Sequence, residues 1–188
     1  MIRNESTKDF KSPYEDQKRE DMGEELASLQ RECEANNVPV IIMVDGWESS
    51  GKGFVINDLV RELDAKGADV SVFNRYDEID DDFYTYQFWR NLPAKGNIAV
   101  FDRSMYYDAF NRLNGDSAGQ AQKIKEIKNL EKLLYDDHTI LIKFFLHQSQ
   151  DEQKVAIEQM KSDPYREFLA DEFDYEQNKN YDLYLNHI

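Results

Sequence analysis

The stretch Val38-Pro39-Val40-Ile41-Ile42-Met43-Val44-Asp45-Gly46-Trp47-Glu48-Ser49-Ser50-Gly51-Lys52-Gly53 decides the fold of this chain. Six of the seven residues from Val38 to Val44 are aliphatic or Met, as in a parallel strand that is buried on both faces. After Gly53, apolar residues recur on one side of a predicted helix that packs against a sheet: Val55, Ile56, Leu59, Val60 and Leu63. The stretch therefore predicts a strand, a tight loop and a helix.

The loop between this strand and this helix has the spacing of a phosphate-binding loop, Gly46-x-x-x-x-Gly51-Lys52. In such loops, glycines let backbone N–H groups approach phosphate oxygens, and the lysine adds positive charge. The usual Ser or Thr that holds magnesium is replaced by Gly53, so Glu48 is the nearest alternative metal ligand. A glycine-rich turn that binds nothing is the competing interpretation. The predicted phosphate-binding residues are Gly46, Ser49, Ser50, Gly51, Lys52 and Gly53.

Composition limits the classes of protein that are compatible with this loop. The chain has 188 residues and a formal net charge of -15, which suits one domain and disfavours broad binding to nucleic acid or to an anionic membrane. Cys33 is the single cysteine, so no intrachain disulfide can form. No apolar stretch reaches the roughly 18 residues of a membrane span, and the N-terminus lacks a signal-peptide core. We therefore expect a cytoplasmic protein.

The rest of the chain alternates predicted strands and helices. Residues 1–13 are polar and are expected to form a flexible arm, and 14–37 to form an N-terminal helix. Residues 111–136 are a polar loop and a lysine-bearing helix, which in a phosphotransferase would be a helical lid over the site. Strands separated by helices predict an α/β fold with a doubly wound parallel sheet flanked by helices. The predicted strands are 38–44, 68–73, 97–101 and 139–146.

Asp102 and Arg103 directly follow the third predicted strand. Open α/β sheets place their chemistry at the carboxyl ends of the strands, and a carboxylate there can hold magnesium beside a phosphate-binding loop. A simple helix cap is the alternative role for Asp102, and one residue can serve both purposes.

Several motifs resemble the polyphosphate kinase 2 family. They are Gly46-Trp-Glu-Ser-Ser-Gly51-Lys52-Gly53, Trp89-Arg-Asn-Leu-Pro-Ala-Lys-Gly96, Phe101-Asp-Arg-Ser-Met-Tyr106, and Leu141-Ile-Lys-Phe-Phe-Leu146 followed by Asp163-Pro164. The resemblance covers roughly residues 38–185 and includes their order and spacing.

The resemblance implies a P-loop kinase-like domain over residues 38–188. It also implies a polyphosphate-dependent nucleotide kinase, which moves a phosphoryl group between inorganic polyphosphate and a nucleoside mono- or diphosphate with Mg²⁺. By position, the catalytic residues are Lys52, Asp102 and Arg103, and the metal ligands are Glu48 and Asp102. Glycine at position 53 and an acid inside the loop are family traits.

The sequence also departs from the family pattern. Asp108 and Met160 stand where arginine is usual, and Leu169 stands where lysine is usual, so phosphate-binding charges are lost. Family members generally continue into a further strand, whereas this sequence stops at Ile188, so the sheet is expected to be short by one strand and the protein to form a homo-oligomer. A catalytically weak or inactive homologue that binds nucleotide or polyphosphate, or serves as an interaction domain, is the alternative function.

Overall fold

The computed structural model describes residues 12, 14–73, 85–111, 117–186 and 188, so the predicted arm lies outside the described residues except for Ser12. Four parallel strands form one sheet in the order β2-β3-β1-β4. This confirms the doubly wound parallel sheet. The strands are β1 (Val40–Gly46), β2 (Ala68–Val72), β3 (Ile98–Asp102) and β4 (Ile140–Leu146).

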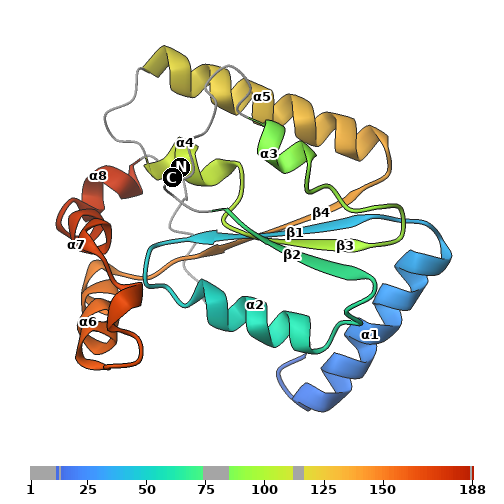
Figure 1. Ribbon diagram of the computed structural model, residues 1–188, viewed down its shortest axis with the longest axis horizontal. Coiled ribbons are helices and arrows are strands. Elements are labelled where there is room, and N and C mark those ends of the chain that lie inside the picture. The colour runs from blue at the N-terminus through green and yellow to red at the C-terminus, as the bar shows by residue number, and fades with distance from the viewer. Residues whose placement is uncertain (1–11, 13, 74–84, 112–116, 187) are drawn as a thin grey trace.

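Helices cover both faces of the sheet (Figure 1). On one face lie α1 (Arg19–Ala35) and α2 (Lys52–Arg61), and on the other lie α3 (Tyr86–Trp89), α4 (Tyr106–Asn111) and α5 (Ser117–Asp136). The remaining elements gather at the end of the sheet where the strands finish. They are α6 (Gln150–Ser162), the 3-10 turn η2 (Glu167–Leu169), α7 (Glu172–Lys179) and α8 (Tyr181–Leu185).

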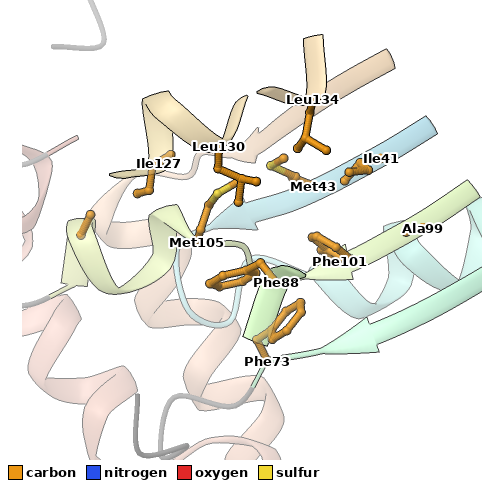
Figure 2. Close-up of a cluster of buried hydrophobic side chains, with 11 residues drawn as sticks. Ile41, Met43, Phe73, Phe88, Ala99, Phe101, Met105, Ile127, Leu130 and Leu134 are labelled. Atoms are coloured by element: carbon orange, nitrogen blue, oxygen red, sulfur yellow. The ribbon is translucent and has the colours of Figure 1, made fainter. Parts of the chain in front are cut away.

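The alternation of side chains along β1 builds two cores, because neighbouring residues of a strand point to opposite faces. Ile41 and Met43 join the core beneath α5, which Figure 2 shows together with Met105 and Phe101. Val40, Ile42 and Val44 join the core beneath α1 and α2. All seven residues of β1 are buried, which fits the continuous apolar run that predicted this strand.

The N-terminal helix is shorter than the sequence predicts. It begins at Arg19 and not at residue 14, because Lys18 is extended and the preceding residues form a turn in which Gln17 N–H donates to the Tyr14 carbonyl at 3.0 Å. Leu26 and Cys33 of this helix pack against the core on the α2 side. This helix therefore covers one face of the sheet together with α2.

In the described part of the chain, β4 pairs with β1 and has no strand on its other side. Its side chains Ile140, Ile142 and Phe144 are exposed, so the described residues leave this outer strand incompletely covered. No helix in the described part is both long and apolar enough to cross a membrane.

Candidate functional site

The loop from Gly46 to Gly51 needs glycine at both ends. Gly46 has a φ of 144° and approaches β4 so closely that a Cβ atom would lie 2.5 Å from the Leu146 carbonyl oxygen. Gly51 has a left-handed φ of 84° and begins helix α2. L residues with side chains rarely adopt either conformation. At Gly53, by contrast, a Cβ atom would meet nothing within 4 Å, so protein packing alone does not require that glycine.

The Lys52 side chain is folded against this loop. Its Nζ donates to the Trp47 carbonyl at 2.8 Å and to the Gly46 carbonyl at 3.4 Å, and Glu48 Oε2 lies 3.8 Å away. Burial lowers the pKa of Lys52 and outweighs the nearby Glu48 charge, which acts in the opposite direction. A buried, poorly hydrated cation at the start of a helix is well placed to attract an anion.

Glu48 connects the two cations of the site. Its Oε2 accepts from Arg103 Nη2 at 3.2 Å, and its Oε1 accepts from the Tyr107 hydroxyl at 2.8 Å. Burial opposes ionisation, but the charges of Lys52 and Arg103 hold the pKa of Glu48 below its ordinary value of 4.5. Both oxygens of Glu48 therefore have protein partners, and a metal ion could bind there only by exchanging them.

Asp102 and Arg103 are brought to the loop by strand register. Because β3 pairs with β1 in parallel, Val44 lies opposite Asp102. Arg103 has a left-handed φ of 64°, a strained conformation that clusters at functional sites. Its neighbour Ser104 donates from N–H to Asp45 Oδ1 at 2.9 Å, which ties this bend to the end of β1.

Three buried polar atoms at the site have no hydrogen-bond partner among the described residues: Ser50 Oγ, Asp102 Oδ1 and Arg103 Nε. Buried polar groups are normally paired, so this cluster of unsatisfied atoms fits a polar or charged ligand. The Asp102 oxygen suits a cation and the Arg103 nitrogen suits an anion. No group of three potential metal-binding side chains occurs in the described part.

All but one of the predicted site residues line the cavity over the loop. Its volume is about 490 Å³, within the roughly 300–1,000 Å³ typical of small-molecule sites. Gly46 is the exception among the predicted residues, although its carbonyl accepts from Lys52. The lining residues include Glu48, Ser49, Ser50, Gly51, Lys52, Gly53, Asp102 and Arg103.

A buried polar network from α6 and α7 holds the loop in place. Gln177 Oε1 accepts from Glu48 N–H at 2.9 Å, and Gln153 Nε2 donates to the Glu48 carbonyl at 3.2 Å and to Gln177 Oε1 at 2.8 Å. Asp174 accepts from the Ser49 hydroxyl at 2.5 Å. The Ser49 side chain is therefore engaged within the protein, and its backbone N–H is the group left to meet a phosphate.

Replacing Gln177 by leucine is expected to lower the free energy of unfolding by about 1–3 kcal/mol, because the buried Glu48 N–H loses its acceptor. Chemical denaturation followed by circular dichroism measures this change. The matched control is Gln122→Leu on the exposed side of α5, where the amide donates to Glu126 at 2.9 Å and its loss should cost less than about 0.5 kcal/mol. Equal effects of the two substitutions would contradict this role of the network.

Sequence reasoning missed the contributions of Arg166, Gln153, Asp174 and Gln177. Arg166 lines the cavity, while its Nε donates to Asp163 Oδ2 at 2.6 Å. A signal for α7 was present, since Asp174, Gln177 and Tyr181 follow one another at spacings of three and four residues, as on one face of a helix. In the structure α7 ends at Lys179, and Tyr181 begins α8. Polar residues that align with a buried stripe can themselves be buried.

Of the three residues that depart from the family pattern, two line the cavity and one does not. Met160 and Leu169 line the cavity. Asp108 is not among its lining residues and forms a largely buried ion pair with Lys123 of α5 at 2.7 Å. The charge of Asp108 is therefore compensated within the protein, so the expected repulsion of a phosphate chain by this residue is reduced.

The parallel sheet, the glycine loop and the lysine at the start of α2 define a P-loop kinase-like fold. The family model of polyphosphate kinase 2 matches residues 9–187, so the chain belongs to the polyphosphate kinase 2 family. Among solved structures, polyphosphate kinase 2 from Arthrobacter aurescens TC1 is similar with a TM-score of 0.82 and 24% identity over 90% of this chain and 63% of that chain. A putative polyphosphate kinase 2 from Pseudomonas aeruginosa gives a TM-score of 0.81 and 23% identity, over 90% of this chain and 38% of that chain.

Two curated relatives illustrate how much of a longer protein this chain matches. The polyphosphate:AMP phosphotransferase of Pseudomonas syringae pv. tomato is 28% identical over 78% of this chain and 30% of its own length. The ADP-polyphosphate phosphotransferase of Rhodopseudomonas palustris is 28% identical over 87% of this chain and 62% of its own length. The chain thus spans less than two thirds of either relative.

Proposed function

We propose that this protein is a polyphosphate-dependent nucleotide kinase, which transfers a phosphoryl group between inorganic polyphosphate and a nucleoside mono- or diphosphate. The observation that supports this most directly is the convergence of Lys52, Arg103 and the unpaired Asp102 oxygen on one cavity over a glycine loop. The names of the relatives, which include polyphosphate:AMP, ADP-polyphosphate and GDP-polyphosphate phosphotransferases, agree with this activity.

Phosphoryl transfer mainly requires positioned phosphates and compensation of charge. Backbone N–H groups at the start of α2 would bind the phosphate oxygens, because the first N–H groups of a helix lack partners within it. Lys52 would neutralise the phosphates at the loop. Arg103 would hold phosphate oxygens through its unpaired Nε, while its Nη2 stays bound to Glu48.

Asp102 is the residue best suited to hold magnesium in this proposal, with Glu48 as a second ligand. A bound magnesium ion would supply positive charge that compensates the negative charge of the transferring phosphates. The protein would contribute the carboxylate of Asp102 at the end of β3. The lid proposed for residues 111–136 includes 112–116, which lie outside the described residues, and the helix α5.

An assay of transfer tests the proposed function. Purified protein is mixed with magnesium, polyphosphate and either AMP or ADP, and the formation of ADP or ATP is followed beside a Lys52→Met variant. Product well above that of the variant would support the kinase. Product equal to that of the variant, with both proteins folded by circular dichroism, would reject it.

A second candidate function is binding of nucleotide or polyphosphate without transfer. It is favoured by Met160 and Leu169, which place apolar groups in the cavity where the family has cations. Retained binding of polyphosphate in the absence of transfer would support this candidate. A homo-oligomer and a cytoplasmic location stay predictions from the sequence.

Arg166 supplies a positive charge to the cavity, where Met160 and Leu169 stand in place of cations that the family has. We expect Arg166→Ala to weaken the apparent affinity for polyphosphate by about three- to tenfold, because charge-assisted hydrogen bonds to phosphate are lost, and the difference should shrink as salt screens the partly exposed charge. Steady-state kinetics over a range of polyphosphate concentrations measure this effect.

The control for Arg166 is Arg61→Ala. Both arginines pair with an aspartate three residues earlier, Arg166 with Asp163 and Arg61 with Asp58, but Arg61 is not among the lining residues of the cavity. If both variants changed the affinity equally, Arg166 would have no specific role in binding.

A further inference from the structure

The ion pair between Glu48 and Arg103 uses only part of one edge of the guanidinium. Glu48 Oε2 accepts from Arg103 Nη2 at 3.2 Å. The Nε of Arg103, which shares this edge with Nη2, is buried and has no partner among the described residues. Arginine and carboxylate side chains frequently form two parallel hydrogen bonds through such an edge. The second oxygen of Glu48 therefore has to be held away from Arg103 Nε by another group.

Tyr107 of α4 is that group. Its hydroxyl donates to Glu48 Oε1 at 2.8 Å. The guanidinium carbon of Arg103 lies 5.3 Å from the centre of the Tyr107 ring, within the range of a cation–π contact. Tyr107 therefore contacts both members of the ion pair, although it is not among the lining residues of the cavity.

The start of α4 is fixed to the end of β1. Ser104 donates from its N–H and from its hydroxyl to the buried carboxylate of Asp45, and Tyr107 N–H donates to the Ser104 carbonyl at 3.0 Å. The same bend includes Arg103, which has a φ of 64°. The end of the strand therefore sets the positions of Arg103 and Tyr107 together.

A closed ring of hydrogen bonds connects Tyr107 with Glu48. The Tyr107 carbonyl accepts from Asn111 Nδ2 at 2.9 Å, and Asn111 Oδ1 accepts from Gln177 Nε2 at 2.7 Å. Gln177 Oε1 in turn accepts from the Glu48 N–H at 2.9 Å, and the Tyr107 hydroxyl completes the ring at the Glu48 side chain. The backbone and the side chain of Glu48 are thus both held in place from α4, the backbone through α7 and the side chain directly.

We propose that Tyr107 is a positioning residue, whose hydroxyl prevents Glu48 from forming a bidentate pair with Arg103 and so leaves Arg103 Nε available to phosphate. Tyr107 acts through Glu48 and needs no contact with the ligand. The inference rests on the proposed function, because the phosphate contact of Arg103 belongs to that function. It adds a residue outside the cavity that controls how much of the arginine a phosphate can use.

Calorimetric titration of the full chain with inorganic tripolyphosphate, in the absence of divalent metal, tests this inference. Tyr107→Phe removes the hydroxyl and keeps the ring against Arg103. We expect this variant to bind tripolyphosphate about tenfold more weakly, because Glu48 then occupies Arg103 Nε and one charge-assisted hydrogen bond to phosphate is lost.

Tyr106→Phe is the matched control. The Tyr106 hydroxyl also donates to a glutamate, Glu131, at 2.7 Å, and its ring also lies near a cation, with Lys143 Nζ 4.9 Å from the ring centre. Neither Tyr106 nor its partners are among the lining residues of the cavity over the loop. This control should leave the affinity for tripolyphosphate within about twofold.

A second variant separates an effect on Arg103 from a general effect on packing. Lysine has no edge with two N–H donors and does not form a bidentate pair. In the Arg103→Lys background, Tyr107→Phe should therefore change the affinity by less than about twofold. The Nε–H signal of Arg103 in a nitrogen–proton correlation spectrum, identified by its absence in Arg103→Lys, should move downfield in Tyr107→Phe and stay in place in Tyr106→Phe.

The inference is overturned if Tyr107→Phe binds tripolyphosphate as tightly as the native protein, or if it weakens binding equally in the Arg103→Lys background. A native protein that does not bind tripolyphosphate would also overturn it, since Arg103 would then make no phosphate contact. Failure of the proposed function is a separate result, which the comparison of transfer with the Lys52→Met variant decides. A protein that shows the expected effect of Tyr107→Phe on binding but transfers no phosphate would keep this inference and lose the kinase activity.

Discussion

Replacing Lys52 by methionine should lower kcat/KM for phosphoryl transfer by roughly 10²- to 10³-fold, the range observed when one preorganised group that stabilises transition-state charge is removed. Lys52 Nζ is fixed by two loop carbonyls and lies inside the cavity beside Arg103. Methionine keeps most of the length of the side chain but removes the charge and the N–H donors. The substitution should therefore slow phosphoryl transfer and leave side-chain packing largely unchanged.

The stability of the Lys52→Met variant shows whether a loss of activity could come from unfolding. Because burial lowers the pKa of Lys52, keeping this amine charged costs desolvation energy, and Glu48 keeps Arg103 as a partner at 3.2 Å. Because the Trp47 carbonyl loses its donor, the free energy of unfolding should fall by no more than about 1–3 kcal/mol.

The control for this substitution is Lys95→Met. Lys95 is an exposed lysine that pairs with Asp137, and it is not among the residues of the cavity. Its replacement should leave kcat/KM within about twofold, because isolated surface pairs contribute little. A Lys52→Met enzyme with activity near that of the native protein would show that this lysine does not stabilise the transferring phosphates.

The fold was predictable because its signals are local or follow from chain geometry. An apolar run of strand length, a glycine pair and a lysine specify β1, the loop and α2 without any long-range information. The meeting of Asp102 with Lys52 was also predictable, since carboxyl ends of parallel strands share one edge of the sheet. The pairing of Val44 with Asp102 in the parallel strands β1 and β3 places Asp102 at this edge, as expected.

The support of the loop was not predictable in the same way. Gln153 and Gln177 lie more than 100 residues from Glu48 in the sequence, and amides on a helix resemble a solvated face unless their burial is known. The same holds for Asp108, whose charge looked unfavourable until its pair with Lys123 placed it away from the cavity lining. Long-range polar pairing decides both cases. Local spacing can indicate that a helical face is buried, as for Gln177, but it does not identify the partner of a buried polar group.

Glu48→Gln should lower the free energy of unfolding by about 3 kcal/mol near neutral pH, because breaking a buried ion pair leaves its partners uncompensated. The substitution removes the negative charge that contacts both Lys52 and Arg103, while the amide remains close in size to the carboxylate. The control Glu62→Gln alters a more exposed pair with Arg61 and should cost less than about 1 kcal/mol.

The pH dependence of the unfolding free energy, compared between the native protein and Glu48→Gln, separates the loss of the buried charge from a loss of packing. The pKa of Glu48 is held below its ordinary value of 4.5 in the folded protein, so the unfolded chain binds the proton more readily and the stabilisation is fully present above that value. It is lost as the pH falls through the lower pKa of the folded state. The difference in unfolding free energy between the native protein and Glu48→Gln should therefore shrink as the pH falls below about 4.5. Urea denaturation followed by circular dichroism at several pH values measures this difference, and a difference that stays constant over the whole range would assign the loss to packing and not to the buried charge.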